Sequence, residues 1–330
     1  MSPIVLTVLA MMISFSLAVF TYPKVIPYFR SLKVNQSVSE YALDAFKDKP
    51  VTPTLGGTVF VAVSLVVALV GYVLVHHFWG YNWRVDHFWL VLAAYAGYSL
   101  IGLWDDYKII KEGNNDGLNP WLKAGLQLVL AIIFFYIYQD AGNPLILNFP
   151  IINQALPLGF LYIILILVMF VGSSNAVNIT DGMDGLAGGT SIIALVPFMI
   201  FAFHQESYLL LILLGSILGS LAGFLLFNHK PAKIFMGDCG SLGLGGMFAA
   251  VALVLSKEII LIIVGGVFVW ETMTVILQIL AVKTIKKRIF KYTPIHYSFI
   301  ISGWREQAVV LMFYLVGIIC AILGLWLGFL

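Results

Sequence analysis

A polar stretch between Asn175 and Gly189 has residue types and spacing suited to chemistry. Asn175, Asn178, Asp181 and Asp184 recur at every third position, so on a helix they share one face and can converge on a single ligand. Carboxylate and amide oxygens in such a row suit a hard divalent cation, or the hydroxyl and amide groups of a nucleotide. Helix capping alone would explain one aspartate and one asparagine, but it explains four residues in register poorly.

Two adjacent carboxylates, Asp105 and Asp106, follow an apolar run and precede Lys108. Such charges at a membrane edge repel each other and need a cation or Lys108 for compensation. One of them is therefore a candidate metal ligand and the other a candidate base. The alternative is a helix end that faces water, where acidic residues are common, so the pair by itself is weak support for a site.

The stretch from Asn228 to Ser241 is the third polar cluster. Lys230 and Lys233 are placed to meet phosphates, and Asp238 is a candidate metal ligand. A helix that starts near Ser241 would offer free backbone N–H groups to an anion. Alternatively, Asp238 and Ser241 simply cap that helix. A functional role is favoured because this would be the third acidic cluster on one side of the predicted membrane helices.

Three isolated ionisable residues are weaker candidates. Lys49 could neutralise a phosphate, and His296 could donate a hydrogen bond to one. Each has a plainer explanation, since lysines gather at membrane surfaces and loop histidines are usually solvated. Glu271 lies inside an apolar run, where a charge is costly, and is expected to face a polar interior or a partner rather than to perform chemistry.

The acids, amides and lysines together predict a site for magnesium and phosphate groups. No cysteine or histidine cluster with zinc-ligand spacing occurs in the sequence. Because the polar clusters lie at the ends of apolar runs, the site is expected at a membrane edge. That location predicts one soluble, phosphorylated substrate and one lipid substrate.

The elements that must position these residues are membrane helices. Hydrophobic residues make up 61% of the chain and charged residues 10%, whereas about a quarter of the residues in soluble domains are charged. We therefore expect one all-α integral membrane domain over residues 1–330. The net charge of +2, without a clustered basic face, argues against nucleic-acid binding.

Apolar runs of about 17 to 25 residues predict spanning helices, and ten such runs are present. An even number of spans places both termini on the same side of the membrane. The predicted spans are residues 3–22, 54–78, 88–104, 121–139, 158–174, 186–203, 207–227, 241–256, 258–282 and 306–328.

The basic residues predict the orientation of these spans. Of the 18 lysines and arginines, 16 fall in one alternating set of loops, and only Arg84 and Lys257 fall in the other. The positive-inside rule places the first set in the cytosol and both termini outside. The polar clusters then all lie at the cytosolic side. On the outer side, prolines among alternating apolar residues in 140–157 predict a small hairpin.

The motifs, in their order along the chain, resemble those of the polyprenyl-phosphate N-acetylhexosamine-1-phosphate transferases, and in particular the muramoyl branch of that family. The resemblance runs from Lys49 to Trp304, about three quarters of the chain. The matching segments are Lys-Pro-Val-Thr-Pro-Thr-Leu-Gly-Gly at 49–57, Asp-Asp-Tyr-Lys at 105–108, Asn-Ala-Val-Asn-Ile-Thr-Asp-Gly-Met-Asp-Gly-Leu-Ala at 175–187, Phe-Met-Gly-Asp-Cys-Gly-Ser-Leu at 235–242, Trp-Glu-Thr at 270–272 and Pro-Ile-His at 294–296.

The resemblance implies a ten-span fold, usually a homodimer, in the bacterial cytoplasmic membrane. It implies a cytosolic cleft that binds UDP-N-acetylmuramoyl-pentapeptide and undecaprenyl phosphate, with Mg²⁺ as the cofactor. The lipid phosphate would attack the sugar-linked phosphorus and UMP would leave, giving lipid I for peptidoglycan biosynthesis. Nucleoside antibiotics are further implied ligands.

The matching motifs also imply residue roles. Asp238 would be the principal magnesium ligand, and Asp105 and Asp106 would serve the lipid phosphate, one of them as its base. The residues implied for the uridine region are Asn178, Asp181, Asn228 and Phe235, with Asp184 beside them. The residues implied to contact phosphate or the sugar end are Lys49, Lys123 and His296. The motifs are compatible both with direct transfer and with an aspartyl-phosphate intermediate.

The last polar segment departs from the family pattern, which usually reads Pro-x-His-His-His-x-Glu. Here Tyr297 and Ser298 follow His296, and the next acid is Glu306. Only His296 is therefore carried over, and the sugar donor is less constrained than the reaction type. The nearest alternative is a UDP-N-acetylglucosamine:undecaprenyl-phosphate N-acetylglucosamine-1-phosphate transferase. An alternative of another class is a secondary transporter, which would place ionisable groups near the bilayer midplane, where only Glu271 is expected.

Overall fold

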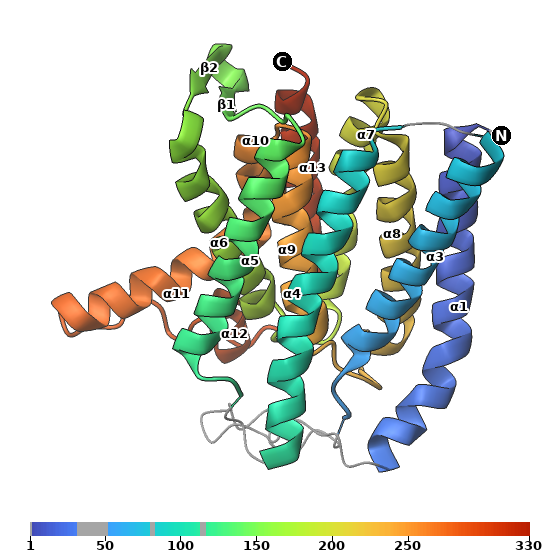
Figure 1. The fold of residues 1–330 in the computed structure, drawn as a ribbon. Helices are drawn as coiled ribbons and strands as arrows, with labels where there is room; N and C mark the ends of the chain where they lie inside the picture. Colours follow the sequence, from blue (N-terminus) through green and yellow to red (C-terminus); the bar gives the residue numbers. More distant parts are fainter. Residues whose placement is uncertain (1, 32–51, 80–82, 113–116) are drawn as a thin grey trace.

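The computed structural model describes residues 2–31, 52–79, 83–112 and 117–330. Lys49, one of the predicted phosphate contacts, lies outside the described residues. Within the described ranges the chain is a bundle of long helices with one small hairpin (Figure 1). Nine of the described helices are long and apolar enough to cross a membrane, which confirms the predicted all-α, polytopic membrane class.

The long helices run up and down the bundle, and the chain reverses direction between them (Figure 1). The helices are α1 (Pro3–Ser31), α3 (Gly56–Trp79), α4 (Val85–Glu112), α5 (Pro120–Asp140), α6 (Tyr162–Thr180), α7 (Leu186–His204), α8 (Tyr208–Asn228), α9 (Asp238–Val254), α10 (Glu258–Val264), α11 (Gly266–Thr284), α12 (Ile295–Ile301) and α13 (Glu306–Gly328).

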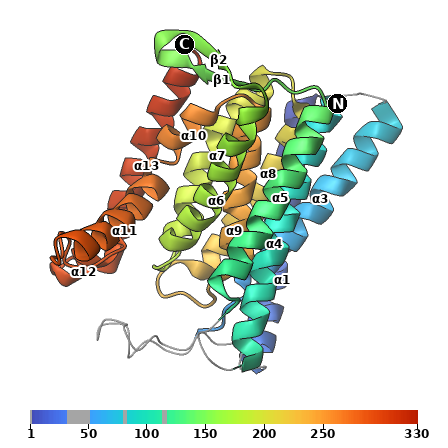
Figure 2. The ribbon, with the colours of Figure 1, turned by 60° about the vertical axis from the view of Figure 1, so that its left-hand side comes forward.

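Two of the predicted spans differ from the observed helices. The span predicted at 258–282 is not one helix, because the chain breaks at Gly265 between α10 and α11. Two consecutive glycines at 265–266 disfavour a continuous helix, and α11 projects sideways from the bundle in Figure 1 and toward the viewer in Figure 2. The span predicted at 241–256 corresponds to α9, which has 17 residues and is shorter than the nine long apolar helices.

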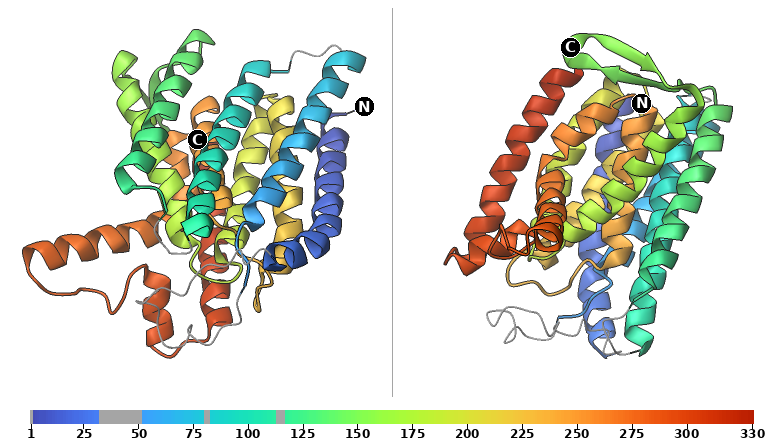
Figure 3. Two further views of the ribbon diagram at one scale, coloured as in Figure 1. Left: turned by 60° about the horizontal axis from the view of Figure 1, so that its bottom comes forward. Right: turned by 90° about the vertical axis from the view of Figure 1, so that its left-hand side faces the viewer.

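The termini and the hairpin lie toward the same end of the bundle (Figures 1 and 3). The hairpin predicted within 140–157 is confirmed: β1 (Ile146–Phe149) and β2 (Gln154–Pro157) pair antiparallel. At the opposite end α4 finishes, α6 leads into α7, and α9 begins. The polar motifs are therefore gathered at the end of the bundle that lies away from the termini.

Helix α9 forms the centre of the bundle and packs mainly against α4 and α6. All of its residues from Cys239 to Val254 are buried. The contact with α4 is tight at Gly102, where an added Cβ would lie 2.0 Å from the carbonyl oxygen of Asp238. Small residues at such crossings allow two helix backbones to approach each other. Gly102 therefore sets the distance between the Asp105–Asp106 pair and the start of α9.

The Gly102→Ala substitution is expected to destabilise the protein and to impair the site together. The methyl group would displace backbone rather than a flexible side chain, and overpacking of this kind costs about 1–3 kcal/mol. Thermal unfolding of the purified protein and the turnover assay described below measure the two effects. Gly125→Ala is the matched control, since an added Cβ at Gly125 meets no atom within 4 Å. Equal behaviour of the two variants would contradict the packing role of Gly102.

Candidate active site

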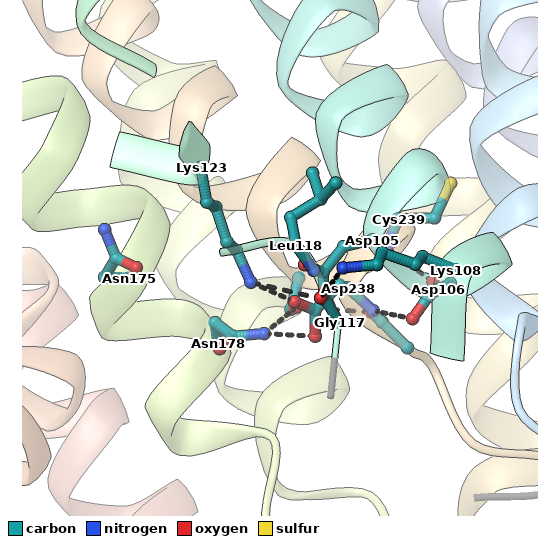
Figure 4. A network of polar contacts seen from close by, with 12 residues as sticks. Asp105, Asp106, Lys108, Gly117, Leu118, Lys123, Asn175, Asn178, Asp238 and Cys239 are labelled. Carbon is teal, nitrogen blue, oxygen red and sulfur yellow. Dashed lines mark hydrogen bonds and ion pairs between the residues drawn. The ribbon is translucent and has the colours of Figure 1, made fainter. Parts of the chain in front are cut away.

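Asp238, the first residue of α9, is the centre of a polar network that joins four helices (Figure 4). One carboxylate oxygen accepts a hydrogen bond of 2.7 Å from the side-chain amide of Asn178 on α6. The other pairs with the ammonium group of Lys123 on α5. Asn178 also donates to the hydroxyl of Ser241 at 2.9 Å, so its amide is held against the first turn of α9.

Asp105 brings α4 into the same network. One of its oxygens accepts a 2.8 Å hydrogen bond from the backbone N–H of Leu118. The other lies 3.5 Å from the Lys123 ammonium, which therefore bridges Asp105 and Asp238. Asp105 is only 5% exposed, and α4 continues beyond it. The alternative reading of the acidic pair as a water-facing helix end is therefore wrong.

Asp106 has a different surrounding from Asp105. Its two oxygens accept hydrogen bonds from the backbone N–H groups of Asp238 and Cys239, at 3.0 and 2.9 Å. A carboxylate is favourable at this place because the first N–H groups of a helix lack intrahelical partners and carry partial positive charge. Asp106 therefore caps α9 from a neighbouring helix, and the proposed capping by Asp238 or Ser241 is not what the structure shows.

Lys108 does not compensate the acidic pair, although its position in the sequence suggested that role. Its ammonium donates to the carbonyl oxygen of Gly117 at 2.9 Å and lies 3.8 Å from Glu112. The compensating cation is Lys123 instead. Because Lys123 is far from the pair in sequence, spacing alone could not identify it; only the family resemblance placed it at a phosphate.

The residues at every third position between 175 and 184 do not all share one helical face. Asn178 faces Asp238, whereas the Asn175 amide donates to the side-chain oxygen of Gln127 at 3.1 Å. Helix α6 ends at Thr180, so Asp184 lies in the following loop, where it accepts a 3.1 Å hydrogen bond from the backbone N–H of Ala232. The row of polar residues is thus divided among contacts with Asp238, Gln127 and Ala232.

Asp181 stands just beyond the end of α6, close to other carboxylates. Although Asp181 is partly exposed, desolvation by the surrounding protein raises its pKa well above the usual range. The negative charges of Asp238, Asp106 and Asp184 raise the pKa further. This end of the bundle therefore concentrates negative charge, which a bound cation would relieve.

Two residues predicted for the uridine region have structural partners. Asn228 is 2% exposed; its side chain accepts from the N–H of Gly185 at 3.0 Å and donates to the carbonyl of Ile234 at 2.9 Å. It thereby ties the α6–α7 connection to the segment before α9. Phe235 is half-buried, and its backbone bonds to Pro53 and Gly56, so the Thr-Pro-Thr-Leu-Gly-Gly motif lies beside it.

His296 packs against the α6–α7 connection and is not part of the Asp238 network. It is fully buried on α12, with its Nδ1 atom 3.1 Å from a carboxylate oxygen of Glu271 on α11. Its Nε2 atom lies close to Gly182, because a Cβ added there would be 2.5 Å away. Glu271 was expected to face a polar interior or a partner, and the buried His296 is its neighbour.

A cavity of about 660 Å³ opens beside the network, between α4, α5 and α6. Its lining includes Asp105, Lys108, Lys123, Gln127 and Asn175. Gln127, which is 1% exposed, was not among the predicted site residues. Its position could have identified Gln127 as a candidate, because it is an amide inside the apolar run at 121–139. A polar group inside a membrane helix usually has a partner.

The carboxylate oxygens of the network fit a magnesium ion whose coordination would be completed by substrate phosphates. Within the described ranges, no three His, Cys, Asp or Glu side chains form a full metal cage. Magnesium needs no such cage, because it commonly takes one or two carboxylates together with waters and substrate phosphates. The bridging position of Lys123 between Asp105 and Asp238 shows that positive charge is stabilised here.

Comparison with known proteins identifies the family. Residues 88–256 match glycosyl transferase family 4. Relatives named phospho-N-acetylmuramoyl-pentapeptide-transferase include one from Geobacillus sp. (strain WCH70), 40% identical over 97% of both chains. Others come from Bacillus cytotoxicus, 42% identical over 96% of both chains, and Bacillus thuringiensis (strain Al Hakam), 41% identical over 96% of both. The chain therefore belongs to glycosyl transferase family 4, in its phospho-N-acetylmuramoyl-pentapeptide transferase branch.

Proposed function

We propose that the chain transfers phospho-N-acetylmuramoyl-pentapeptide from its UDP-linked donor to undecaprenyl phosphate, giving lipid I and UMP. The observation that carries the proposal is the network in which Asp105, Lys123, Asn178 and Asp238 meet from four helices. Phosphoryl transfer depends chiefly on positioning and charge neutralisation, and this network supplies both. The name shared by relatives that match nearly the whole chain supports the same reaction.

Within this proposal Asp105 is the base that serves the lipid phosphate. Both oxygens of Asp106 are engaged by backbone N–H groups of α9, whereas Asp105 receives one backbone N–H and a longer contact from Lys123. Asp105 also lines the cavity, where an incoming phosphate would have access to it. Asp106 then acts by holding α9, and with it Asp238, in place.

Lys123 and Asn178 have separate tasks in the proposed reaction. The Lys123 ammonium is shared by two carboxylates and would turn toward a phosphate oxygen as the substrates enter. Asn178 keeps the Asp238 carboxylate oriented through its 2.7 Å hydrogen bond. Magnesium held by Asp238 would neutralise charge on the pyrophosphate when bound. Lys123, together with a metal ion held by Asp238, would thus provide positive charge on the donor side, and Asp105 faces the acceptor.

The proposal includes a cytosolic site in the bacterial cytoplasmic membrane, with the chain as a homodimer. The excess of lysine and arginine in the loops at the site's end supports this orientation. The structure supports it further, because α4 ends toward the end of the bundle opposite the termini (Figure 1), and Asp105 and Asp106 lie in the last turns of α4. A UDP-linked donor is water-soluble, so a site at this edge can meet donor and lipid acceptor together.

The test of the proposed function is UMP release by the purified full-length protein in undecaprenyl-phosphate vesicles with magnesium. Turnover of UDP-N-acetylmuramoyl-pentapeptide, with lipid I as the second product, is expected. Turnover only of UDP-N-acetylglucosamine would instead assign the N-acetylglucosamine-1-phosphate reaction. Absence of UMP with both donors would refute the transferase assignment.

Removal of the metal is expected to abolish that turnover. Lys123 is already shared by the Asp105 and Asp238 carboxylates, so without a divalent ion the pyrophosphate charge would be poorly neutralised. Treatment with EDTA should stop UMP release, and added Mg²⁺ should restore it. Full activity in excess EDTA would show that the carboxylates act without a metal.

A further inference from the structure

The connection between α6 and α7, here called the 181–185 loop (Asp181–Gly185), is held from outside the polar network. It begins at Asp181, which lies near the carboxylates of the site, and ends at Gly185, from which α7 starts. Two of its backbone carbonyls accept hydrogen bonds from tyrosines of the C-terminal helices. Tyr297 on α12 donates to Gly182 at 3.1 Å, and Tyr314 on α13 donates to Gly185 at 2.7 Å.

Apolar packing places the loop on the same C-terminal helices. Met183 is 5% exposed, and Leu186, just after the loop, is fully buried. Both belong to a small core, separate from the main core of the bundle, that they form with Ile295 of α12 and Val309 and Phe313 of α13 among others. The loop therefore takes part of its position from α12 and α13, in addition to its bonds with Asn228 and Ala232, whereas the Asp238 network is built by α4, α5, α6 and α9.

The approach of α12 to the loop is close. A Cβ at Gly182 would lie 2.5 Å from the His296 ring and 3.0 Å from the Tyr297 hydroxyl, so the loop backbone contacts both side chains directly. Tyr297 also packs on His296, with ring centroids 4.1 Å apart. Tyr297 stands where the family pattern has a second histidine, and its longer side chain reaches the Gly182 carbonyl.

We propose that Tyr297 and Tyr314 are positioning residues that fix the 181–185 loop for the nucleotide half of the donor. This inference rests on the proposed function and on the uridine region that the family resemblance implies for Asp181. Each hydroxyl donates to a backbone carbonyl of the loop, so the two tyrosines act through the loop. Their removal should therefore weaken nucleotide binding and leave the chemical step nearly unchanged.

The test compares Tyr297→Phe, Tyr314→Phe and the double variant of the full-length protein. Each single variant is expected to raise the Kd for UMP and the KM for the UDP-linked donor about 5-fold, as loss of one hydrogen bond would. The double variant should raise them about 25-fold, and kcat should stay within about 2-fold. Calorimetric titration with UMP and initial rates give these quantities.

Tyr95→Phe is the matched control. The Tyr95 hydroxyl is buried within α3 and α4, 3.2 Å from that of Ser64, and does not touch the loop. This variant should lower thermal stability without changing UMP affinity. A double variant that binds UMP as tightly as the unmodified protein would overturn the proposal. A lower kcat at unchanged KM would overturn it as well.

Hydrogen exchange separates failure of this inference from failure of the proposed function. Backbone amides in 183–189 should exchange faster in both tyrosine variants than in the unmodified protein and in Tyr95→Phe, whether or not a nucleotide is the ligand. If the unmodified protein does not bind UMP, the proposed function fails, and faster exchange still supports the positioning role. Unchanged exchange in the double variant would show that apolar packing alone holds the loop.

Discussion

Replacing Asp238 with asparagine is expected to reduce UMP release by about 10³-fold, on the scale seen when a charge-neutralising group is removed from a phosphoryl-transfer site. The substitution keeps the shape of the side chain but removes the charge that pairs with Lys123. It should also weaken binding of the divalent ion. The rate is measured with undecaprenyl phosphate and the UDP-linked donor, and the metal affinity by titration with Mn²⁺.

The matched control for this variant is Asp140→Asn. Asp140 is the exposed last residue of α5, at the end of the bundle opposite the site, and its neutralisation should change neither rate nor Mn²⁺ affinity. An Asp238→Asn protein with normal Mn²⁺ affinity would contradict the assignment of Asp238 as metal ligand. A rate within 10-fold of the unmodified enzyme would contradict its place at the centre of the site.

Replacing Asp105 with asparagine is the second large effect, and we expect kcat to fall by about 10²–10⁴-fold, the usual range for loss of a general base. The unfolding temperature should change little, because the asparagine side-chain oxygen can still accept the Leu118 N–H bond. Rates under saturating donor and thermal unfolding separate the two effects.

Asp106→Asn is the informative comparison for Asp105. An amide at this position keeps one acceptor but turns an NH₂ group toward a backbone N–H of α9, where two acceptors are now used. Its main expected effect is therefore a lower unfolding temperature, with loss of activity following from displacement of Asp238. If Asp106→Asn folds as stably as the unmodified protein but loses turnover, while Asp105→Asn stays active, the roles of the two residues are reversed.

The replacement of two family histidines is also explained by local contacts. Ser298 is buried, accepts a hydrogen bond from the N–H of Tyr292 at 2.9 Å and donates to the carbonyl of the same residue at 2.5 Å. Tyr297 reaches the 181–185 loop. Tyr297 and Ser298 therefore both help to hold α12 in place. His296 keeps an imidazole next to Gly182.

Much of the helical framework could be predicted from the sequence, because membrane helices are recognised by the length and apolar composition of their segments. Each predicted span overlaps an observed helix, and the hairpin lies where the prolines predicted it. The break at Gly265 was missed, since the apolar composition continues through α10 and α11 and hydropathy does not respond to helix direction. The orientation in the membrane stays a prediction from the charges of the loops.

The sequence by itself determined that acids, amides and lysines gather at one end of a membrane bundle, and its motifs determined the family. Only the tertiary structure decided which side chain does what. Asp106 accepts a hydrogen bond from the backbone N–H of Asp238, 132 positions away, and Lys123 pairs with the Asp238 carboxylate, 115 positions away. Partners at such distances have no spacing signal, because helix packing, rather than helical periodicity, brings them together. For this reason Asp105 and Asp106, neighbours of the same type, could be told apart only by the groups that surround them.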